Sequence, residues 1–160
     1  LLIRDNGFWA FLPGVSKPIR ISLQQRLTGE VSNGDVARVN LSGNYKAKLA
    51  GSEVVDKVSC LVFSLAAVNE FVTYGKIRYW VRADDYSPVK AEFYAVSGRL
   101  LKTCSFEDYK EIGGRLRPAR LVLRNPLVKG QYSVIEYEGM NAKELPDRYF
   151  TKDYMKKIKY

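Results

Sequence analysis

Apolar and polar residues alternate with a period of two along most of the chain. In Lys76–Ala83, for example, Ile77, Tyr79 and Val81 are separated by charged residues and by Trp80. Such alternation predicts β-strands with one apolar and one solvated face. The segments that show this pattern or continue the series are Gly7–Leu12, Pro18–Leu23, Asn44–Ala50, Lys76–Ala83, Val89–Val96, Leu100–Tyr109, Arg115–Arg124 and Gln131–Glu138.

Two further segments predict strands on other grounds. Val58–Ala67 is nearly all apolar, which is typical of a strand covered on both faces, and Leu1–Ile3 resembles the middle of a strand. Pro13-Gly14 closes the first aromatic strand. Short turn motifs separate later strands, at Ala83–Pro88, Ser97-Gly98, Gly113-Gly114 and Lys129-Gly130. Consecutive strands joined by short turns predict an antiparallel meander.

Helix is expected at only two places. Gly34–Leu41 is short and predicts one or two helical turns. Thr151–Ile158 follows Pro146-Asp147 and carries Thr151 as an N-cap, with apolar residues behind it. The chain shows no repeat, linker or low-complexity segment, and 160 residues fit one domain. We therefore expect a single domain over residues 1–160.

A sheet protein with so little helix needs some other cover for its apolar face. The sheet can close on itself, pair with a second sheet, meet further N-terminal helices or enclose a ligand. A filled core and a cavity for one acyl-type ligand fit the pattern equally well. Alternation assigns the walls of such a cavity to Trp9, Phe11, Ile19, Ile21, Tyr79, Val81, Phe93, Leu121 and Leu123.

The sequence contains few of the residue combinations that enzymes use for catalysis. Histidine is absent, which removes Ser–His–Asp and Cys–His pairs. The two cysteines, Cys60 and Cys104, are too few for a Cys/His metal site, and the pattern leaves open whether they form a disulfide or stay as thiols. The paired carboxylates Asp84-Asp85 and Glu107-Asp108 lie at or near turns. We expect no enzyme, no catalytic residue, no metal and no cofactor.

The net charge of +9 favours acidic partners, including nucleic acid and anionic membranes. A nucleic-acid interface needs cations interleaved with aromatics, and Arg78, Trp80 and Arg82 share one face of a predicted strand. The alternative is an outer-face tryptophan with arginine stems packed on it. A second candidate is the C-terminal group Lys152, Lys156, Lys157 and Lys159, which is equally typical of a solvated helix end.

Short motifs follow one another along the whole chain. It opens with Leu2–Asp5, Trp9 and Leu12-Pro13 and closes with Leu145–Thr151. Between them lie Tyr45, Leu49, Gly51, Glu53, Asp56, Tyr74, Lys76-Ile77, Trp80-Val81, Pro88, Glu92–Tyr94 and Gly98–Lys102. The order and spacing of these motifs resemble the LolA-like outer-membrane lipoprotein-sorting proteins, with the opening set similar to that family's first strand pair and Leu145–Thr151 similar to its closing motif. The resemblance covers nearly the whole chain.

This resemblance implies a mainly β fold, an antiparallel and incompletely closed β-barrel with a few short capping helices. It implies a periplasmic carrier, made with a signal peptide, whose apolar concave side holds acyl chains of lipoproteins or related lipids on their way toward the outer membrane. The implied partners are an inner-membrane lipid or lipoprotein exporter and an outer-membrane acceptor. The family's N-terminal helix and first strands have no counterpart here, so we expect part of the barrel to be missing. The alternative is a sensing or interaction domain that binds lipid without transferring it.

Overall fold

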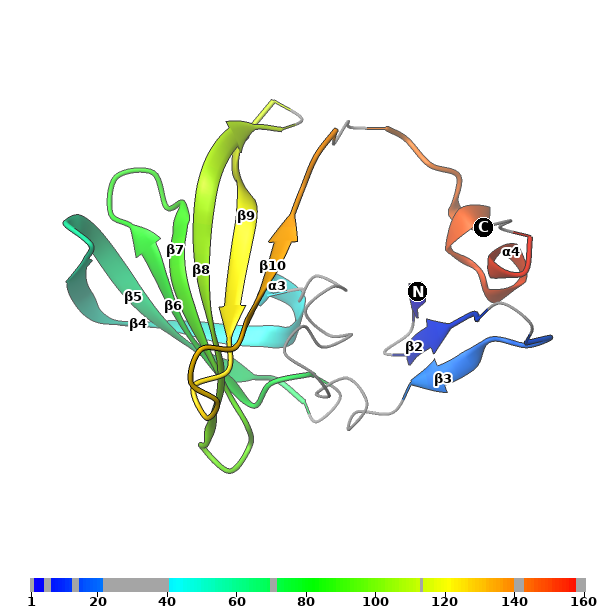
Figure 1. Ribbon diagram of the computed structural model, residues 1–160, viewed down its shortest axis with the longest axis horizontal. Helices are drawn as coiled ribbons and strands as arrows, with labels where there is room; N and C mark the ends of the chain where they lie inside the picture. The colour runs from blue at the N-terminus through cyan, green and yellow to red at the C-terminus, as the bar shows by residue number, and fades with distance from the viewer. Residues whose placement is uncertain are drawn as a thin grey trace. The chain divides into compact units, whose positions relative to one another are not determined.

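The computed structural model describes residues 2–4, 7–12, 15–21, 41–69, 72–112, 114–139 and 143–157. The chain divides into two compact units, one of Asn40–Asn141 and one of Leu1–Val39 with Ala142–Tyr160. Each unit contains its own β-sheet (Figure 1). The expectation of a single domain over residues 1–160 stays a prediction.

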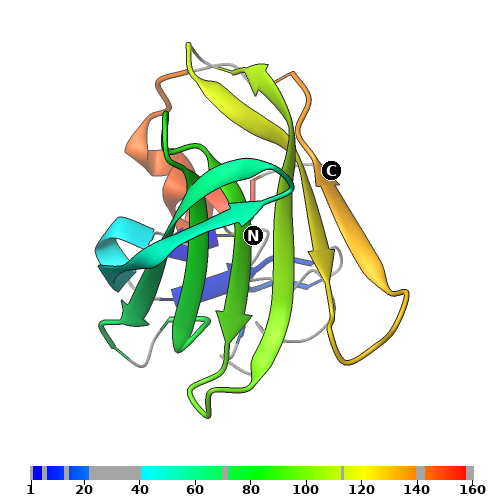
Figure 2. The same cartoon turned by 90° about the vertical axis from the view of Figure 1, so that its left-hand side faces the viewer.

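The larger unit is a seven-stranded antiparallel sheet preceded by a short helix, α3 (Leu41–Asn44). Its strands neighbour one another in chain order, so the predicted meander is confirmed. The sheet is curved (Figure 2), and in its described part β4 and β10 remain as separate edges. This confirms the mainly β, incompletely closed barrel. The strands are β4 (Tyr45–Val55), β5 (Val58–Ala67), β6 (Lys76–Arg82), β7 (Pro88–Tyr94), β8 (Leu100–Glu111), β9 (Leu116–Arg124) and β10 (Tyr132–Glu136).

Strand β4 runs past its predicted end as far as Val55, because a bulge interrupts the alternation. Its pairing with β5 shifts between Leu49 and Gly51, and Gly51 has a φ of 149° that favours glycine. A bulge bends a strand and increases its twist. Asp56 and Lys57, with φ of 49° and 69°, then form the two-residue turn into β5. Figure 2 shows the resulting hairpin crossing the neighbouring strands at a steep angle.

The connection from β5 to β6 is held against the sheet by Tyr74 and Gly75. The Gly75 N–H donates to the Tyr94 carbonyl at 2.9 Å. A Cβ at Gly75 would lie 2.8 Å from the Cα of Val96, so the close approach requires glycine. The hydroxyl of Tyr45 donates to the carbonyl of the fully buried Tyr74 at 3.0 Å. These contacts tie the start of β4 to the start of β6.

The smaller unit has a three-stranded antiparallel sheet of β1 (Leu2–Arg4), β2 (Gly7–Ala10) and β3 (Ile19–Ile21). A 3-10 helix, η1 (Asp147–Phe150), and a one-turn helix, α4 (Lys152–Met155), follow near the end of the chain. The prediction of Thr151 as an N-cap is confirmed, because its Oγ1 accepts from the Tyr154 N–H at 3.2 Å. The rings of Tyr149 and Tyr154 stack with centroids 4.5 Å apart.

Some predicted features lie outside the described residues. These are Leu1, Asp5, the turn Pro13-Gly14, the last part of the predicted strand Pro18–Leu23, residues 34–40 of the predicted helix Gly34–Leu41, Gly113, Ile158 and Lys159. Within the described ranges, no helix has the length and hydrophobicity needed to span a bilayer.

The two cysteines are buried thiols on opposite faces of the larger sheet. Cys60 is fully buried beside Trp80, whereas Cys104 pairs with Ala91 across β7 and β8. A disulfide between them would have to cross the sheet, so the structure favours the thiol alternative.

Candidate functional site

Cross-strand register separates the seven-stranded sheet into two faces, since directly opposed residues of antiparallel strands lie on the same side. The apolar face is defined by three rows of opposed residues. One row crosses every strand, with Leu49, Phe63, Tyr79, Ala91, Cys104, Leu123 and Ser133. A second row contains Phe106, Leu121 and Ile135, and a third contains Ala47, Leu65, Ile77, Phe93 and Lys102.

Burial changes across this apolar face. Ile77 and Ala91 are fully buried, and Leu123 is nearly so. By contrast Leu49, near the edge of the sheet, is 54% exposed. A group of large side chains is half-buried, namely Leu61, Phe63, Tyr79, Phe106, Leu121 and Ile135. The face therefore combines a packed base with a partly exposed apolar surface, which is the composition of a site for an apolar ligand.

Tyr79 and Phe106 form the aromatic centre of this half-buried group. Their ring centroids are 5.8 Å apart in an edge-to-face arrangement. The phenol of Tyr79 is neutral at physiological pH, as tyrosine ordinarily is, and burial raises its pKa further. A neutral aromatic pair of this kind offers dispersion contacts to a hydrocarbon chain without charge to desolvate.

Lys102 interrupts the apolar face. It lies opposite Phe93 and is only 5% exposed. Phe93 also contacts the ring of Tyr74, with centroids 4.6 Å apart. A lysine can pack its methylene stem along apolar neighbours while its amine finds polar contacts. Alternation did not predict this residue as part of the site, because a charged residue within a strand is normally assigned to the solvated face.

The structure places five of the nine predicted wall residues on the apolar face. Tyr79 and Val81 lie on β6, Phe93 lies on β7, and Leu121 and Leu123 lie on β9. Their cross-strand partners connect them into the rows described above. Their role in binding stays a prediction.

The other four predicted residues belong to the smaller unit and do not share one face. Ile19 and Ile21 pair with Ala10 and Phe8, whereas Trp9 pairs with Arg20. Trp9 therefore faces away from both isoleucines, and a binding role for these four residues stays a prediction. The Nζ of Lys152 lies 3.4 Å from the centroid of the Trp9 ring, so Trp9 packs against a cation. Phe11 follows the end of β2.

Four residues of the half-buried apolar group were not predicted from the sequence. Leu61 and Phe63 lie in the uninterrupted apolar run of β5, where alternation carries no signal for either face. Phe106 and Ile135 follow the expected period in β8 and β10, each two residues after a residue of the same face, Cys104 and Ser133. The register across strands, which the sequence does not contain, decides all four.

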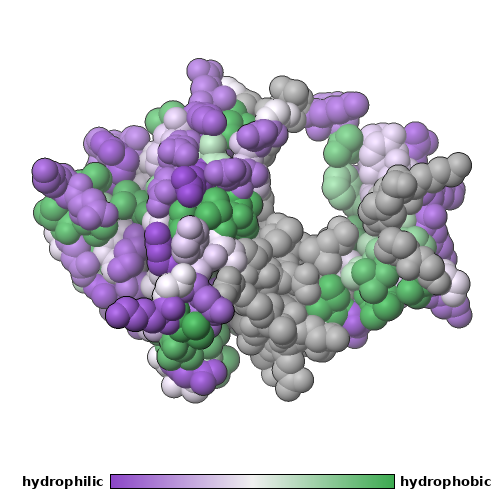
Figure 3. Space-filling view, viewed as in Figure 1, coloured by the Kyte–Doolittle hydropathy of each residue, from purple (hydrophilic) through white to green (hydrophobic). Residues whose placement is uncertain are grey.

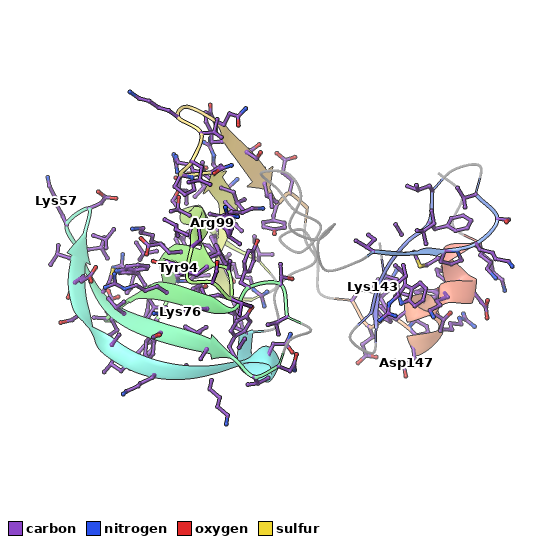
Figure 4. All side chains as sticks on the ribbon, turned by 90° about the horizontal axis from the view of Figure 1, so that it is seen from below. Lys57, Lys76, Tyr94, Arg99, Lys143 and Asp147 are labelled. Carbon is purple, nitrogen blue, oxygen red and sulfur yellow. The ribbon has the colours of Figure 1, made fainter. Side chains whose placement is uncertain are left out.

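The opposite, polar face has a small apolar centre under charged groups. Cys60, Val62 and Trp80 are buried, with Val55, Val58 and Val89 packed against them. The Trp80 Nε1 donates to Glu53 Oε2 at 2.8 Å, and Glu53 also pairs with Arg78. The Arg78 guanidinium and the Lys90 amine lie 4.7 and 4.6 Å from the Trp80 ring centroid. Figure 4 shows Lys57 at the hairpin tip and the neighbouring Lys76 and Tyr94, whose amine and ring centroid are 5.9 Å apart.

This arrangement bears on the nucleic-acid alternative. Arg78, Trp80 and Arg82 share a face as expected, but Trp80 is only 2% exposed. A base cannot stack on a ring that is buried between two cations. Arg82 in turn pairs with Asp84 at 2.8 Å. The packing is that of a structural tryptophan with charged stems over it, which was the alternative interpretation.

Other groupings in the described ranges offer less for a ligand. No set of three Asp, Glu or Cys side chains gathers there in a way that would hold a metal. A hollow of about 520 Å³ lies at the β9–β10 turn, with Thr103, Arg124, Lys129 and Tyr132 among its lining residues. Its lining mixes apolar residues with the cations Arg124 and Lys129, whereas the apolar face presents a continuous set of large apolar side chains.

The chain is similar to several proteins of known structure. A family model described only as an uncharacterized protein matches residues 1–157. Among curated proteins, none matches. A LolA superfamily protein from Nitrosomonas europaea shares 45% sequence identity, with a TM-score of 0.84 over 95% of this chain and 69% of that one.

Two further crystal structures are similar. A DUF1329 family protein from Desulfovibrio piger is 25% identical, with a TM-score of 0.80 over 96% of this chain and 66% of its own. A domain described as an outer membrane lipoprotein-sorting protein, from Vibrio parahaemolyticus, is 22% identical, with a TM-score of 0.73 over 94% of this chain and 66% of its own. The last likeness shows the fold alone. The chain spans 66% to 69% of the length of these structures.

Proposed function

The chain belongs to the LolA superfamily, and from this premise we propose that it is a non-enzymatic carrier that binds an acyl chain on the apolar face of its seven-stranded sheet. The observation that carries the proposal is the half-buried group around Tyr79, Phe106 and Leu121. Large apolar side chains on an open, curved sheet form a surface suited to a long hydrocarbon. The ligand class is the acyl chain of a lipoprotein or a related lipid.

Binding and release need no covalent step. Each methylene that leaves water for the apolar face contributes about 0.8 kcal/mol, less the cost of ordering the chain and fixing the ligand. The neutral Tyr79 lets the aromatic centre contact the chain without a charge penalty. Release follows when an acceptor offers an equal or better apolar site, so the carrier works by exchange.

The proposed location is the periplasm, between an inner-membrane exporter that loads the carrier and an outer-membrane acceptor that unloads it. The outer membrane lipoprotein-sorting description of a relative with the same fold supports this direction. The net charge of +9 would favour encounter with anionic membrane surfaces or acidic partners. Such encounters should weaken as ionic strength rises.

The test uses full-length protein purified from its own envelope. Native mass spectrometry should detect co-purified lipid, and delipidated protein should take up a fluorescent fatty acid saturably. Absence of both lipid and saturable uptake would contradict the proposal.

A second assay separates a carrier from a sensor. Protein loaded with fluorescent lipid is mixed with acceptor vesicles, and the rate of transfer is compared with spontaneous release. A carrier accelerates transfer in proportion to its concentration. Tight binding without any acceleration would instead identify a sensing or interaction domain.

A further inference from the structure

Charges that face one another across the larger sheet are mostly compensated. Arg78 lies opposite Glu92 on β7. On the next strands Arg120 lies between Glu107 and Glu136, with its Nε 3.9 and 3.8 Å from their carboxylates. Opposite charges on facing strands stabilise the pairing of a sheet, whereas like charges directly opposed destabilise it.

One opposed pair breaks this rule. Lys110 on β8 lies directly opposite Arg117 on β9, and Arg115 lies in the turn that joins the two strands. Within the described ranges none of these three cations forms an ion pair, and Asp108, two residues before Lys110, forms none either. We call Lys110, Arg115 and Arg117 the basic rim. These uncompensated like charges should destabilise the sheet. Their presence therefore indicates a function other than folding.

The basic rim continues the apolar face. The pairing of β8 with β9 keeps one register on both sides of Asp108, so Lys110 and Arg117 lie on the same side as Phe106 and Leu121. Lys110 lies four positions after Phe106, or about 13 Å along the strand. This end of the β8–β9 hairpin projects beyond the neighbouring strands at the top of Figure 1, and hydrophilic side chains gather there in Figure 3.

We propose that the basic rim binds the anionic group, carboxylate or phosphate, of an amphiphilic lipid whose hydrocarbon chain lies on the apolar face. The inference rests on the proposed function, since it needs a chain bound near Phe106 and Leu121. It adds the polarity of the ligand and its direction on the sheet. The apolar part lies toward Tyr79, and the charged end lies toward the turn between β8 and β9.

The chemistry of the rim suits such a group. Arginine presents a planar fork of donors that matches carboxylate and phosphate oxygens, and lysine adds a compact positive charge. Bound anion would also relieve the repulsion between Lys110 and Arg117. Lys110 and Arg115 are exposed and Arg117 is half-buried, so the contribution should fall as salt screens it.

The experiment compares three ligands with the same sixteen-carbon chain, namely hexadecanoate, hexadecyl phosphate and hexadecanol, each displacing Nile red from delipidated full-length protein. At low salt the unmodified protein should bind at least one of the anions about tenfold more tightly than the neutral alcohol. Which anion binds more tightly identifies the carboxylate or the phosphate as the natural group. The preference should shrink at high salt.

The variant Lys110→Gln with Arg117→Gln should lose this preference while keeping its affinity for hexadecanol. Its thermal stability should stay the same or rise, because the substitution removes a repulsion; a purely structural role for the two cations predicts a fall. The matched control, Lys46→Gln with Lys48→Gln, removes two exposed cations from the polar face and should keep the preference.

Three results would overturn the inference. Equal affinity for all three ligands in unmodified protein would remove it while leaving the carrier proposal intact. So would an unchanged preference in the rim variant, including the case in which that variant loses only its association with anionic vesicles and the rim is a membrane-docking site. Failure of every ligand to displace Nile red would instead contradict the proposed function itself, and the inference with it.

Discussion

The two faces of the larger sheet differ in how far their aromatic side chains are covered by the rest of the protein. On the polar face, Trp80 is covered by the hairpin of β4 and β5, by the Arg78 and Lys90 stems and by its hydrogen bond to Glu53. On the apolar face, Tyr79 is one residue away in sequence, yet it remains half-buried beside a half-buried Phe106.

This difference links the polar face to the stability of the fold and the apolar face to the binding of a ligand. The chain itself covers the tryptophan of the polar face, so that side chain is part of what holds the fold together. The aromatic centre of the apolar face keeps surface available to another molecule, at some cost in stability. Substitutions on the polar face should therefore change unfolding, and substitutions on the exposed part of the apolar face should change ligand uptake.

The largest expected effect is the loss of Trp80. Trp80→Ala leaves a cavity under the hairpin and should lower the free energy of unfolding by about 3–5 kcal/mol, measured by urea denaturation. Tyr132→Ala is the matched control, because this aromatic residue of the same face is 60% exposed and should change stability by less than about 0.5 kcal/mol. Equal losses in the two variants would remove the contrast between covered and exposed aromatics on this face.

A smaller effect is expected on the apolar face, and on a different property. Phe106→Asp puts a charge beside Tyr79 and Leu121, and desolvating it against a hydrocarbon chain should weaken acyl binding at least tenfold, or about 1.4 kcal/mol. Thr103→Asp places the same charge on the opposite face of the same strand, opposite Arg124, and should leave binding unchanged. Circular dichroism checks that both variants fold. Binding that survives in Phe106→Asp, or falls equally in both, would contradict the assignment of the site.

The smallest effect concerns Tyr45, which is the first residue of β4 and is only 5% exposed. Burial raises the pKa of Tyr45 from its usual 10.0 to about 12. The unfolded chain therefore loses this proton first as pH rises, so stability that is intact below pH 10 falls between about pH 10 and 12. Tyr45→Phe should cost about 1 kcal/mol at neutral pH through the lost hydrogen bond to Tyr74.

The same variant should make the alkaline decline in stability shallower. The decline would not vanish, because burial also raises the pKa of Tyr94 and Tyr109 to about 12. Denaturant titrations at pH 8, 10 and 11 measure it. A decline as steep in Tyr45→Phe as in the unmodified protein would show that Tyr45 does not titrate as a buried phenol.

Most of the fold could be predicted from the alternation of side chains. Each strand of the larger sheet lies where a period of two, or an apolar run, predicted it. The main error was the length of β4, because the bulge at Gly51 breaks the alternation while the hydrogen-bonded pairing continues. A local period cannot distinguish a strand that ends from one that bends.

The site was harder to predict because a face is a property of several strands together. Within β6 the period of two alone predicted that Tyr79 and Trp80 lie on different faces of the sheet. In the short strands β2 and β3, by contrast, nothing in the sequence decides that Trp9 pairs with Arg20 and not with an isoleucine. A shift of one residue in register exchanges the two faces of a strand. The like-charge pair of Lys110 and Arg117 was hidden for the same reason.

The central claim, that one face of the sheet binds the acyl chain, is tested most directly by nuclear Overhauser contacts between a bound fatty acid and methyl-labelled protein. Leu121 and Val122 are neighbours on β9 whose side chains lie on opposite faces, and Ile135 and Val134 are their cross-strand partners on β10. We predict ligand contacts to the methyl groups of Leu121 and Ile135 and none to those of Val122 and Val134. Contacts confined to the two valines, or saturable binding without contact to Leu121 and Ile135, would contradict the account.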